Sequence, residues 1–392
     1  MHQSRYVPAM QDLLILGGGI VGAGVARDAA LRGLSVTLID KHTVGWGTSS
    51  RSSRMIHGGI RYLELGDMHL VHEALAERAI LLRIAPHLVR PQPFLFVLDA
   101  GEYWQWFRVG VGVMVYRALA SRHAMGAHHP LRRAGLVRRE PLLSNAALAG
   151  GALYQDAHGD DIGLVRSNIA SAVHAGARVI ENVHARLRVA DDSVEATLPD
   201  GERVAARSLV VAAGPWTDAV RAEIGLADRG LVGGTKGSHI AFPLARVPLR
   251  HAIAMRHPDD RRVLFCVPEA ERNRVLVGTT DTETAELPDA LTVTPGEVGY
   301  LLRAMQHLFP ALQLDERDIS ARWAGLRPLL RQQGSPSART REHLIQRERN
   351  VLTIAGGKLT TYRKMAAEAV DMLDGILGVN MPPCTTATVP LP

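Results

Sequence analysis

The sequence predicts an α/β fold in which a parallel βαβ domain is interleaved with a domain built on an antiparallel sheet. Three observations predict it. A strand at 12–16, a helix at 20–32 and a strand at 35–39 follow one another in the order of a βαβ unit. Several apolar segments between 236 and 280 are separated by turn residues, as in an antiparallel sheet. A strand and a long helix after residue 350 then return to the parallel pattern.

The first βαβ unit is predicted from local spacing. Val21, Val25 and Ala29 fall on one helical face, and Gly33 follows where a helix end favours glycine. The next segment, LSVTLID, is apolar and rich in β-branched residues, as strands are.

The middle of the chain predicts further elements. An amphipathic pattern within 68–88 predicts a helix that ends near Pro86, and a basic, uneven stretch follows to about residue 150. A helix and a strand are expected within 161–182, a hairpin around the Asp-Gly of LPDGERV, and a buried strand in SLVVAAGPW. Thr294 and Glu297 have the spacing of a capping box at the start of another helix.

These elements predict two interleaved domains and a tail. The terminal helix is expected to return to the first domain. The predicted segments are 1–92, 151–232 and 346–380 for the first domain, 93–150 and 233–345 for the second, and 381–392 for an extended tail.

Composition narrows the class of protein. Lys and Arg outnumber Asp and Glu by 45 to 39, and the pI is about 9.6. This balance suits an anionic substrate, an anionic membrane or a nucleic acid, but no nucleic-acid-binding motif occurs, so none is expected as a partner. Cys266 and Cys384 have no metal-ligand spacing, so no metal site is expected. The sequence has neither a signal-peptide pattern nor a run of about 20 apolar residues, which predicts a cytoplasmic protein.

A dinucleotide fingerprint lies in LLILGGGIVGAGVARDAALRGLSVTLID. Gly17, Gly19 and Gly22 have the G-x-G-x-x-G spacing that permits a tight turn, a close approach to a diphosphate and close helix packing. The helix that follows presents free N–H groups to phosphates. Asp40 ends the second strand, where a carboxylate can accept from a ribose hydroxyl. This motif does not separate NAD from FAD.

Two later stretches point to a flavin and an anionic substrate. AGGKLTTYRK, residues 355–364, leads a glycine pair into a helix start, whose dipole would stabilise the negative charge of a reduced flavin. SSRMIHGGIRYLE, residues 52–64, gathers arginines, a phenol and a glycine pair beside the fingerprint. Such groups suit a small phosphorylated alcohol.

Taken in order, these stretches resemble the FAD-dependent glycerol-3-phosphate dehydrogenases of the D-amino-acid-oxidase-like flavoprotein superfamily. The resemblance runs from residue 12 to about 365 and is carried above all by HGGIRYLE and GGKLTTYRK, with AAGPWTD, KGSHI, VGTTD and GLRPL between them. It implies a Rossmann-like FAD-binding domain with an interleaved antiparallel-sheet substrate domain. It also implies oxidation of sn-glycerol 3-phosphate to dihydroxyacetone phosphate, transfer of electrons to a quinone or another acceptor, and peripheral attachment to the inner face of the membrane.

The resemblance, together with the fingerprint, assigns residues to the cofactor. The predicted FAD-binding residues are Gly17, Gly19, Gly22, Asp40, Thr48, Ser49, Ser50, Gly214, Gly357, Lys358, Leu359 and Thr360. The chain departs from the family pattern in three ways. It is expected to be a short form without the family's C-terminal helical domain, it has LRQQGSPSA after GLRPL, and it carries Arg51 and Arg54 within TSSRSSRM.

The predicted chemistry needs cations for phosphate and a base for the hydroxyl proton. Arg327 and Lys358 are predicted catalytic cations, with Arg61 and Arg341 as further phosphate ligands. Tyr62 is expected to bond a substrate oxygen. His239 in KGSHI is the predicted base, kept neutral by nearby cations. Asp281 is expected to be a turn residue rather than an acid.

Two other functions remain open from the sequence. An amine or 2-hydroxy-acid oxidase of the same fold would bind a carboxylate, for which one arginine suffices; four candidate cations favour phosphate. A non-catalytic FAD-binding subunit would have no need of the predicted catalytic residues. The aromatic and arginine-containing stretch 104–117 is compatible with a membrane-surface contact, a dimer contact or a buried core.

Overall fold

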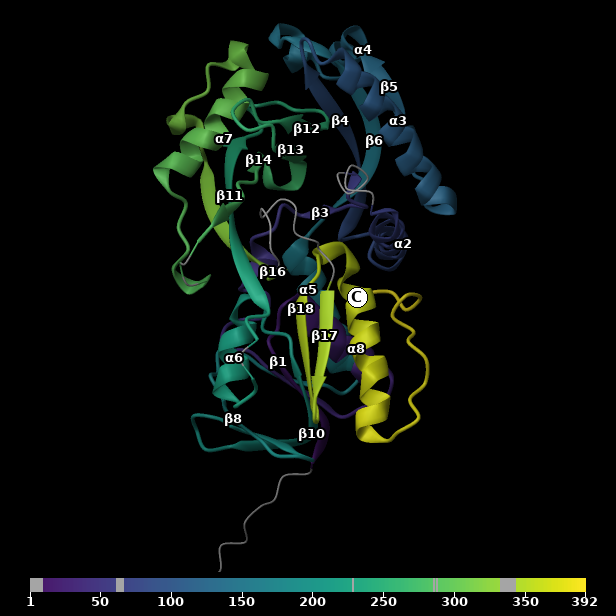
Figure 1. The fold of residues 1–392 in the computed structure, drawn as a ribbon, viewed down its shortest axis with the longest axis vertical. Coiled ribbons are helices and arrows are strands. Elements are labelled where there is room, and N and C mark those ends of the chain that lie inside the picture. Colours follow the sequence, from purple (N-terminus) through teal and green to yellow (C-terminus); the bar gives the residue numbers. More distant parts are fainter. Residues whose placement is uncertain (1–9, 61–66, 228, 285, 287, 332–342) are drawn as a thin grey trace, which may run out of the picture.

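Two β-sheets organise the protein, one above the other in the view of Figure 1. The computed structural model describes residues 10–60, 67–227, 229–284, 286, 288–331 and 343–392. The two sheets alternate along the chain, as the predicted interleaving requires. Strands of the first sheet come from 11–39, 178–211 and 343–356, and strands of the second from 55–159 and 232–330. The predicted domain boundaries themselves stay a prediction.

The first sheet has the parallel core that the sequence predicts. Within the described chain its order is β17-β18-β10-β1-β2-β7, parallel throughout except at the β17–β18 edge, and the hairpin β8–β9 extends β10. The strands are β1 (Gln11–Leu16), β2 (Val36–Ile39), β7 (Arg178–Ile180), β8 (Arg186–Val189), β9 (Val194–Thr197), β10 (Arg203–Val211), β17 (His343–Glu348) and β18 (Val351–Gly356).

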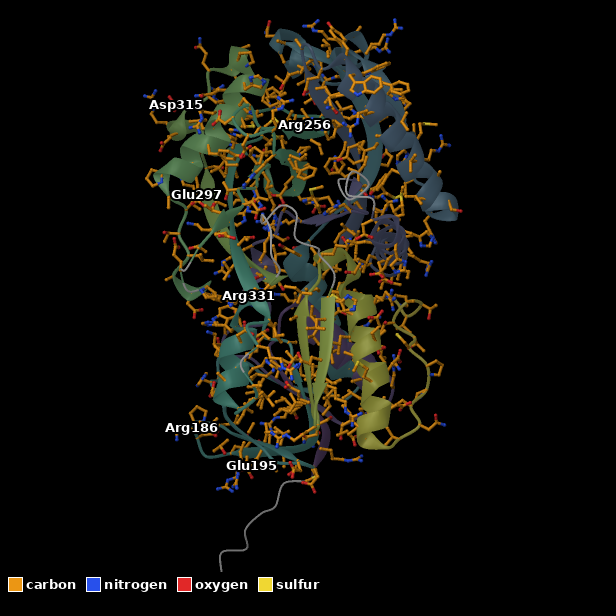
Figure 2. All side chains as sticks on the ribbon, viewed as in Figure 1. Arg186, Glu195, Arg256, Glu297, Asp315 and Arg331 are labelled. Atoms are coloured by element: carbon orange, nitrogen blue, oxygen red, sulfur yellow. The ribbon has the colours of Figure 1, made fainter. Side chains whose placement is uncertain are left out.

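Helices cover one face of this sheet and the hairpin covers the other. Leu13 and Ile15 point to α1 (Ile20–Leu31), α5 (Asp161–His174) and α8 (Tyr362–Leu377), while Leu14 points to the hairpin and α6 (Thr217–Glu223). This alternation follows from the two-residue period of a strand. Both faces of the central strands are buried, which explains why β1, β2 and β18 are mostly apolar. Arg186 and Glu195 mark the outer end of the hairpin, far from the second sheet (Figure 2).

The second sheet is largely antiparallel. Within the described residues its order is β15-β11-β14-β13-β12-β4-β6-β3, with β16 also paired to β11 and β5 to β6; the β12–β4 pair is parallel. Its strands are β3 (Met55–Ile56), β4 (Val89–Asp99), β5 (His129–Arg132), β6 (Leu148–Gly159), β11 (Val232–Pro243), β12 (Ala252–Arg256), β13 (Val263–Glu269), β14 (Arg274–Gly278), β15 (Thr282–Glu283) and β16 (Ala321–Leu330).

Four helices pack around the second sheet. They are α2 (Met68–Ile84), α3 (Tyr103–Ala120), α4 (Arg133–Arg139) and α7 (Pro295–Leu308). Leu301 and Met305 of α7 lie in one apolar cluster with Ile240 and Phe242 of β11. The capping box of α7 is present as predicted: Thr294 accepts from the backbone of Glu297, whose carboxylate accepts from Thr294.

The helix predicted to end near Pro86 ends at Ile84, because Pro86 disfavours helical geometry at Ala85. One long strand was not predicted. The stretch before residue 150 contains β4, a long strand that its prolines conceal from pattern analysis. Pro91 and Pro93 are tolerated because β12 pairs with β4 only at Phe94–Phe96, so the proline-bearing half has one ladder neighbour.

Candidate active site

A cavity of about 930 Å³ lies where the two sheets meet. Its lining joins the turn after β1, the loop 45–60, the second-sheet strands β11 and β16, and the turn after β18. It therefore lies at the carboxyl ends of the parallel strands β1, β10 and β18, the usual ligand position in a doubly wound sheet. Its size is near the upper end for ligand sites and leaves room for a large cofactor with a small substrate.

The fingerprint glycines are required by contact distances. A Cβ at Gly17, whose φ is +107°, would lie 2.5 Å from the carbonyl oxygen of Ala212. A Cβ at Gly22 would lie 1.9 Å from the carbonyl oxygen of Gly17. Gly19 is the N-cap of α1 and lines the cavity. The turn thus presents bare backbone and a helix N-terminus to the cavity, as a diphosphate site requires.

Asp40 lies at the end of β2, next to this turn, and also lines the cavity. One carboxylate oxygen accepts from the Gly18 N–H at 2.5 Å and the other from the His42 N–H at 2.7 Å. Burial raises the pKa of Asp40 above its usual value. Each oxygen retains a lone pair, so the carboxylate can also accept from a ribose hydroxyl.

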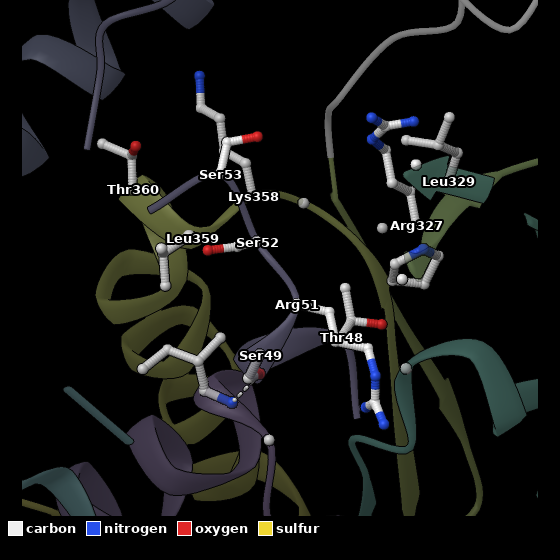
Figure 3. A pocket seen from close by; sticks show the side chains of 18 of the residues that line it. Thr48, Ser49, Arg51, Ser52, Ser53, Arg327, Leu329, Lys358, Leu359 and Thr360 are labelled. Atoms are coloured by element: carbon white, nitrogen blue, oxygen red, sulfur yellow. Dashed lines mark hydrogen bonds between the residues drawn. The ribbon is translucent and has the colours of Figure 1, made fainter. Parts of the chain in front are cut away.

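Thr48, Ser49 and Ser50 form the 3₁₀ turn η1 (Thr48–Ser50) beside the same helix end. The Ser49 hydroxyl accepts from the Ile20 N–H at 2.9 Å, and the Thr48 hydroxyl donates to the carbonyl of Leu326 in β16 at 2.6 Å. Figure 3 shows Ser49 and Thr48 close together below the cavity centre. This turn therefore bonds to both halves of the protein.

The turn after β18 supplies another wall of the cavity, formed by Gly356–Thr360. Gly357 has a φ of +79°, and a Cβ there would lie 2.4 Å from Met365 Sδ. The Thr360 hydroxyl accepts from the His57 N–H at 3.1 Å and lies 3.3 Å from the His57 carbonyl. Lys358 and Leu359 line the cavity here, and Gly214 lines it from the turn after β10.

Arg327 projects from β16 into the same cavity, opposite Lys358 (Figure 3). Its guanidinium donates to Asp281 Oδ1 at 2.9 Å, to Thr279 Oγ1 at 2.9 Å and to the Thr280 carbonyl at 3.1 Å. Asp281 is thus more than a turn residue, because its carboxylate fixes the direction of Arg327. A guanidinium held by an ion pair to Asp281 therefore lies at the cavity edge of the second sheet.

His239 lies on β11, where its ring stacks on Trp323 with centroids 5.2 Å apart and planes 10° apart. Nε2 is 2.9 Å from Ser53 Oγ. Burial, followed by the positive charges of Arg327 and Arg54, lowers the pKa of His239 to about 3. The ring is therefore neutral at physiological pH, in the direction the sequence predicts, although burial is the larger cause.

Comparison with known proteins decides the family. A family model described as FAD dependent oxidoreductase matches residues 12–362. The chain belongs to this family of FAD-dependent oxidoreductases. The predicted flavin cofactor, the enzyme class and the α/β fold are thereby confirmed.

Within this flavoprotein family the similar sequences are glycerol-3-phosphate dehydrogenases. The aerobic glycerol-3-phosphate dehydrogenase of Bacillus subtilis is 35% identical, covering 97% of this chain and 70% of the relative. That of Staphylococcus aureus (strain USA300) is 33% identical, covering 96% and 70%. The predicted resemblance to these dehydrogenases is confirmed.

Solved structures agree with this placement of the flavoprotein. The Bacillus halodurans glycerol-3-phosphate dehydrogenase, complexed with FAD, superposes with a TM-score of 0.77 at 30% identity, covering 98% of this chain and 68% of that one. The L-alpha-glycerophosphate oxidase of Mycoplasma pneumoniae has a TM-score of 0.75 at 17% identity, covering 98% and 99%, and shows the shared fold alone.

The described residues fit FAD. The turn from Gly17 to Gly22, whose backbone contacts leave no room for a Cβ at either position, brings the N-terminus of α1 to the cavity, as a diphosphate requires. Asp40 offers acceptors for a ribose, and the cavity continues from there to Arg327 on the second sheet. No group of three or more His, Cys, Asp or Glu side chains in the described chain is placed to hold a metal ion.

The structure brings together some predicted catalytic residues of this flavoprotein and leaves others untested. Arg327, Lys358 and His239 line one cavity. Arg61, Tyr62 and Arg341 lie outside the described residues.

No site role was predicted from the sequence for Ser53, Arg54 or His57, which also line the cavity. All three belong to SSRMIHGGIRYLE, in which Arg54 was noted only as a departure from the family pattern. The motif marked the stretch, but it did not indicate that Ser53 would contact His239. The Arg54 guanidinium forms ion pairs with two carboxylates of the protein, Glu269 at 2.7 Å and Asp161 at 3.3 Å.

Proposed function

We propose that this flavoprotein oxidises sn-glycerol 3-phosphate to dihydroxyacetone phosphate. One observation supports the proposal above all. Arg327, within β16, and Lys358, in the turn after β18, line the same cavity as the dinucleotide turn. Two cations beside a flavin site suit a phosphate, which carries close to two negative charges. The relatives named glycerol-3-phosphate dehydrogenase support the same substrate.

Each half of the cavity has a proposed role. The first sheet and its helices hold FAD, with Gly17, Gly19, Gly22 and Asp40 at the adenosine diphosphate half and residues 357–360 near the flavin. When bound, FAD supplies the acceptor for the hydride that leaves the substrate carbon.

The substrate lies between the second sheet, which carries Arg327, and the turn after β18, which carries Lys358. Arg327 and Lys358 bind the phosphoryl group and orient the alcohol. The neutral imidazole of His239 is the final acceptor of the hydroxyl proton, a role typically worth about 10²–10⁴-fold in rate. Arg61, Tyr62 and Arg341 complete the proposed set from segments outside the described residues.

Anaerobic bleaching of the bound flavin tests the substrate. Glycerol 3-phosphate should bleach it, whereas glycerol should do so poorly because it offers the cations no phosphate. Bleaching by amino acids or 2-hydroxy acids instead would move the assignment to an oxidase of carboxylate substrates. A flavin that none of these reduces would indicate a non-catalytic subunit.

Two variants test the cations. Arg327→Ala and Lys358→Ala should each raise the glycerol 3-phosphate concentration needed for half-maximal bleaching at least tenfold, while the flavin spectrum stays in place. Loss of flavin from Arg327→Ala would mean that Arg327 binds the cofactor instead. Loss of flavin from Lys358→Ala would leave Lys358 with its predicted FAD-binding role alone.

We further propose that α3 contacts a membrane surface, from which a quinone takes the electrons. No described helix is both long and apolar enough to cross a membrane. An exposed apolar stripe follows α3, formed by Tyr103, Trp104, Phe107, Val111 and Met114. Exposed Arg108 and Arg117 flank this α3 stripe and would meet anionic headgroups. Trp104, Phe107 and Val111 also line the flavin cavity, which supports an acceptor arriving from this side.

Vesicle binding tests the α3 stripe. Phe107→Ser should weaken co-sedimentation with vesicles that contain anionic phosphatidylglycerol. The matched control is Val173→Ser, which removes an equally exposed apolar side chain from α5. Equal binding by both variants and the unchanged protein would contradict the assignment.

A further inference from the structure

The proposed base does not offer a ring nitrogen to the cavity. Nε2 of His239 is occupied by the Ser53 hydroxyl at 2.9 Å. Nδ1 is fully buried and has no hydrogen-bond partner among the described residues. The whole residue is 3% exposed. A substrate hydroxyl in the cavity therefore meets Ser53 before it can meet the imidazole.

The ring of His239 is held in this orientation from both sides. On one side it stacks on Trp323, its cross-strand partner on β16, and the Arg274 guanidinium lies 5.0 Å from the Trp323 ring. On the other side it passes over Gly278 so closely that a Cβ there would lie 2.2 Å from His239 Cδ2. A rotation that turned Nε2 toward a substrate would lose the stacking and the Ser53 bond together.

Ser53 stands between this ring and the cavity. It lines the cavity, and Figure 3 shows its hydroxyl directed into the space that separates Lys358 from Arg327. Both neighbours of Ser53 are anchored: Ser52 Oγ donates to Asp161 at 2.8 Å, and the Arg54 guanidinium donates to Glu269 at 2.7 Å. The serine hydroxyl is therefore fixed within reach of both the ring and a bound alcohol.

We propose that Ser53 is a catalytic residue that relays the substrate proton to His239. The inference rests on the proposed oxidation of a phosphorylated alcohol. As hydride leaves the carbon for FAD, the O–H bond of the substrate breaks and its proton passes to Ser53 Oγ. The proton of Ser53 passes to Nε2 of His239 in the same step. The substrate becomes a ketone, the serine is restored, and the ring ends as an imidazolium.

Bound substrate would change the charges around the ring in the direction that this end state needs. Burial is the largest contribution opposing a positive ring, followed by Arg327 and Arg54, whereas Glu269 favours it. The dianionic phosphate, held against Arg327 and Lys358, would offset the two arginines but not the burial. The imidazolium is therefore a transient end state that the substrate phosphate and Glu269 stabilise in part.

A double-mutant cycle in the holoenzyme tests the relay. Ser53→Ala and His239→Gln should each slow anaerobic flavin reduction by glycerol 3-phosphate by about 10²–10⁴-fold, and the double variant should be no slower than the slower single variant. Ser53→Thr, which keeps the hydroxyl, should restore most of the rate. Additive losses, or a Ser53→Ala enzyme as fast as the unchanged one, would overturn the relay.

Ser238→Ala is the matched control. Ser238 is a buried serine next to His239 on β11, but it points to the other face of the strand and does not line the cavity. Its removal should leave flavin reduction unchanged. If Ser238→Ala slowed flavin reduction as much as Ser53→Ala, the relay would be contradicted. Removal of either serine would then act by disturbing the packing around His239.

Two readouts do not depend on the variants' activity. In the unchanged holoenzyme, the rate of flavin reduction should depend non-linearly on the deuterium fraction of the solvent, because two protons move in one step; a linear dependence overturns the relay.

In the substrate-free holoenzyme, the ¹⁵N signal of His239 Nε2 should shift on Ser53→Ala and stay in place on Ser238→Ala. An unchanged Nε2 signal in Ser53→Ala would also overturn it. If glycerol 3-phosphate fails to bleach the unchanged enzyme, the proposed function fails instead, and the ¹⁵N measurement still tests the contact.

Discussion

Gly237→Ala should displace the side chain of Arg327, and so impair its function, although Arg327 itself is not substituted. Gly237 lies on β11 under the guanidinium of Arg327, which projects from the adjacent strand β16. A Cβ at this position would lie 2.5 Å from Arg327 Nη2, 2.8 Å from its Cζ and 2.7 Å from Thr279 Oγ1. Ordinary contacts between such atoms are about 3.5 Å, so the guanidinium has to move by roughly 1 Å.

That displacement has a calculable consequence. Nη2 would leave Thr279, now 2.9 Å away, and the bond to Asp281 would lengthen. A shift of about 1 Å in a substrate-positioning group can cost about 10²-fold in rate, which corresponds to about 2.7 kcal/mol. The fold should survive because the displaced group is the far end of a flexible side chain, and flavin content should stay unchanged.

The assay is kcat/KM for glycerol 3-phosphate with an artificial dye as acceptor, alongside flavin content. Gly299→Ala is the matched control, since its Cβ would meet Arg303 Nη1 at an ordinary 3.5 Å. In an Arg327→Ala background, Gly237→Ala should have little further effect. Equal loss in both backgrounds would refute the claim that the glycine acts through Arg327, and no loss at all would refute the estimated displacement.

Three further outcomes are expected. Asp40→Ala removes the acceptor of two backbone N–H groups and of the expected ribose bond, so FAD should bind about tenfold more weakly or worse, measured by fluorescence titration of the flavin-free protein. The folded pKa of His239, about 3, lies below the value of about 6.5 expected when unfolded, so the unfolded chain gains a proton as pH falls from 6.5 toward 3. Stability is therefore lost on acidification, and His239→Gln should show a smaller drop in Tm across that window. Thr294→Ala should lower the unfolding free energy by about 1 kcal/mol in a denaturant titration and leave kcat/KM unchanged, because it removes only the cap of α7.

Short sequence patterns predicted those elements whose formation depends on residues close together in the chain. The fingerprint turn, α1 and the capping box of α7 each depend on residues within a few positions of one another. β4 was not recognised, because its two prolines are permitted only by a partner strand that stops short of them. That condition concerns β12, more than a hundred residues away, and cannot be read from the segment itself.

The same dependence on distant residues explains which site residues could be predicted from the sequence. Arg327 and Lys358 could be selected from motifs, since cations are conspicuous. Ser53 could not, because a serine becomes a relay candidate only through its 2.9 Å contact with a histidine on β11. Nothing near His239 in the sequence indicates that its ring would stack on Trp323 and pass over Gly278, since strand register sets both contacts.

The short segment from Thr48 to Arg54 explains why the cavity lies at the junction of the sheets. Thr48 donates to β16 of the second sheet, and Ser49 accepts from the first N–H of α1 behind the first sheet. Four residues later Ser53 contacts His239, and Arg54 pairs with Glu269 on β13. One segment thus couples the cofactor end to the proton-accepting end through bonds of 2.6–2.9 Å. A substitution in this segment that weakened the contacts near the cofactor diphosphate would therefore also displace the Ser53 hydroxyl. The affinity for FAD and the rate of flavin reduction should then decrease together in variants of this segment.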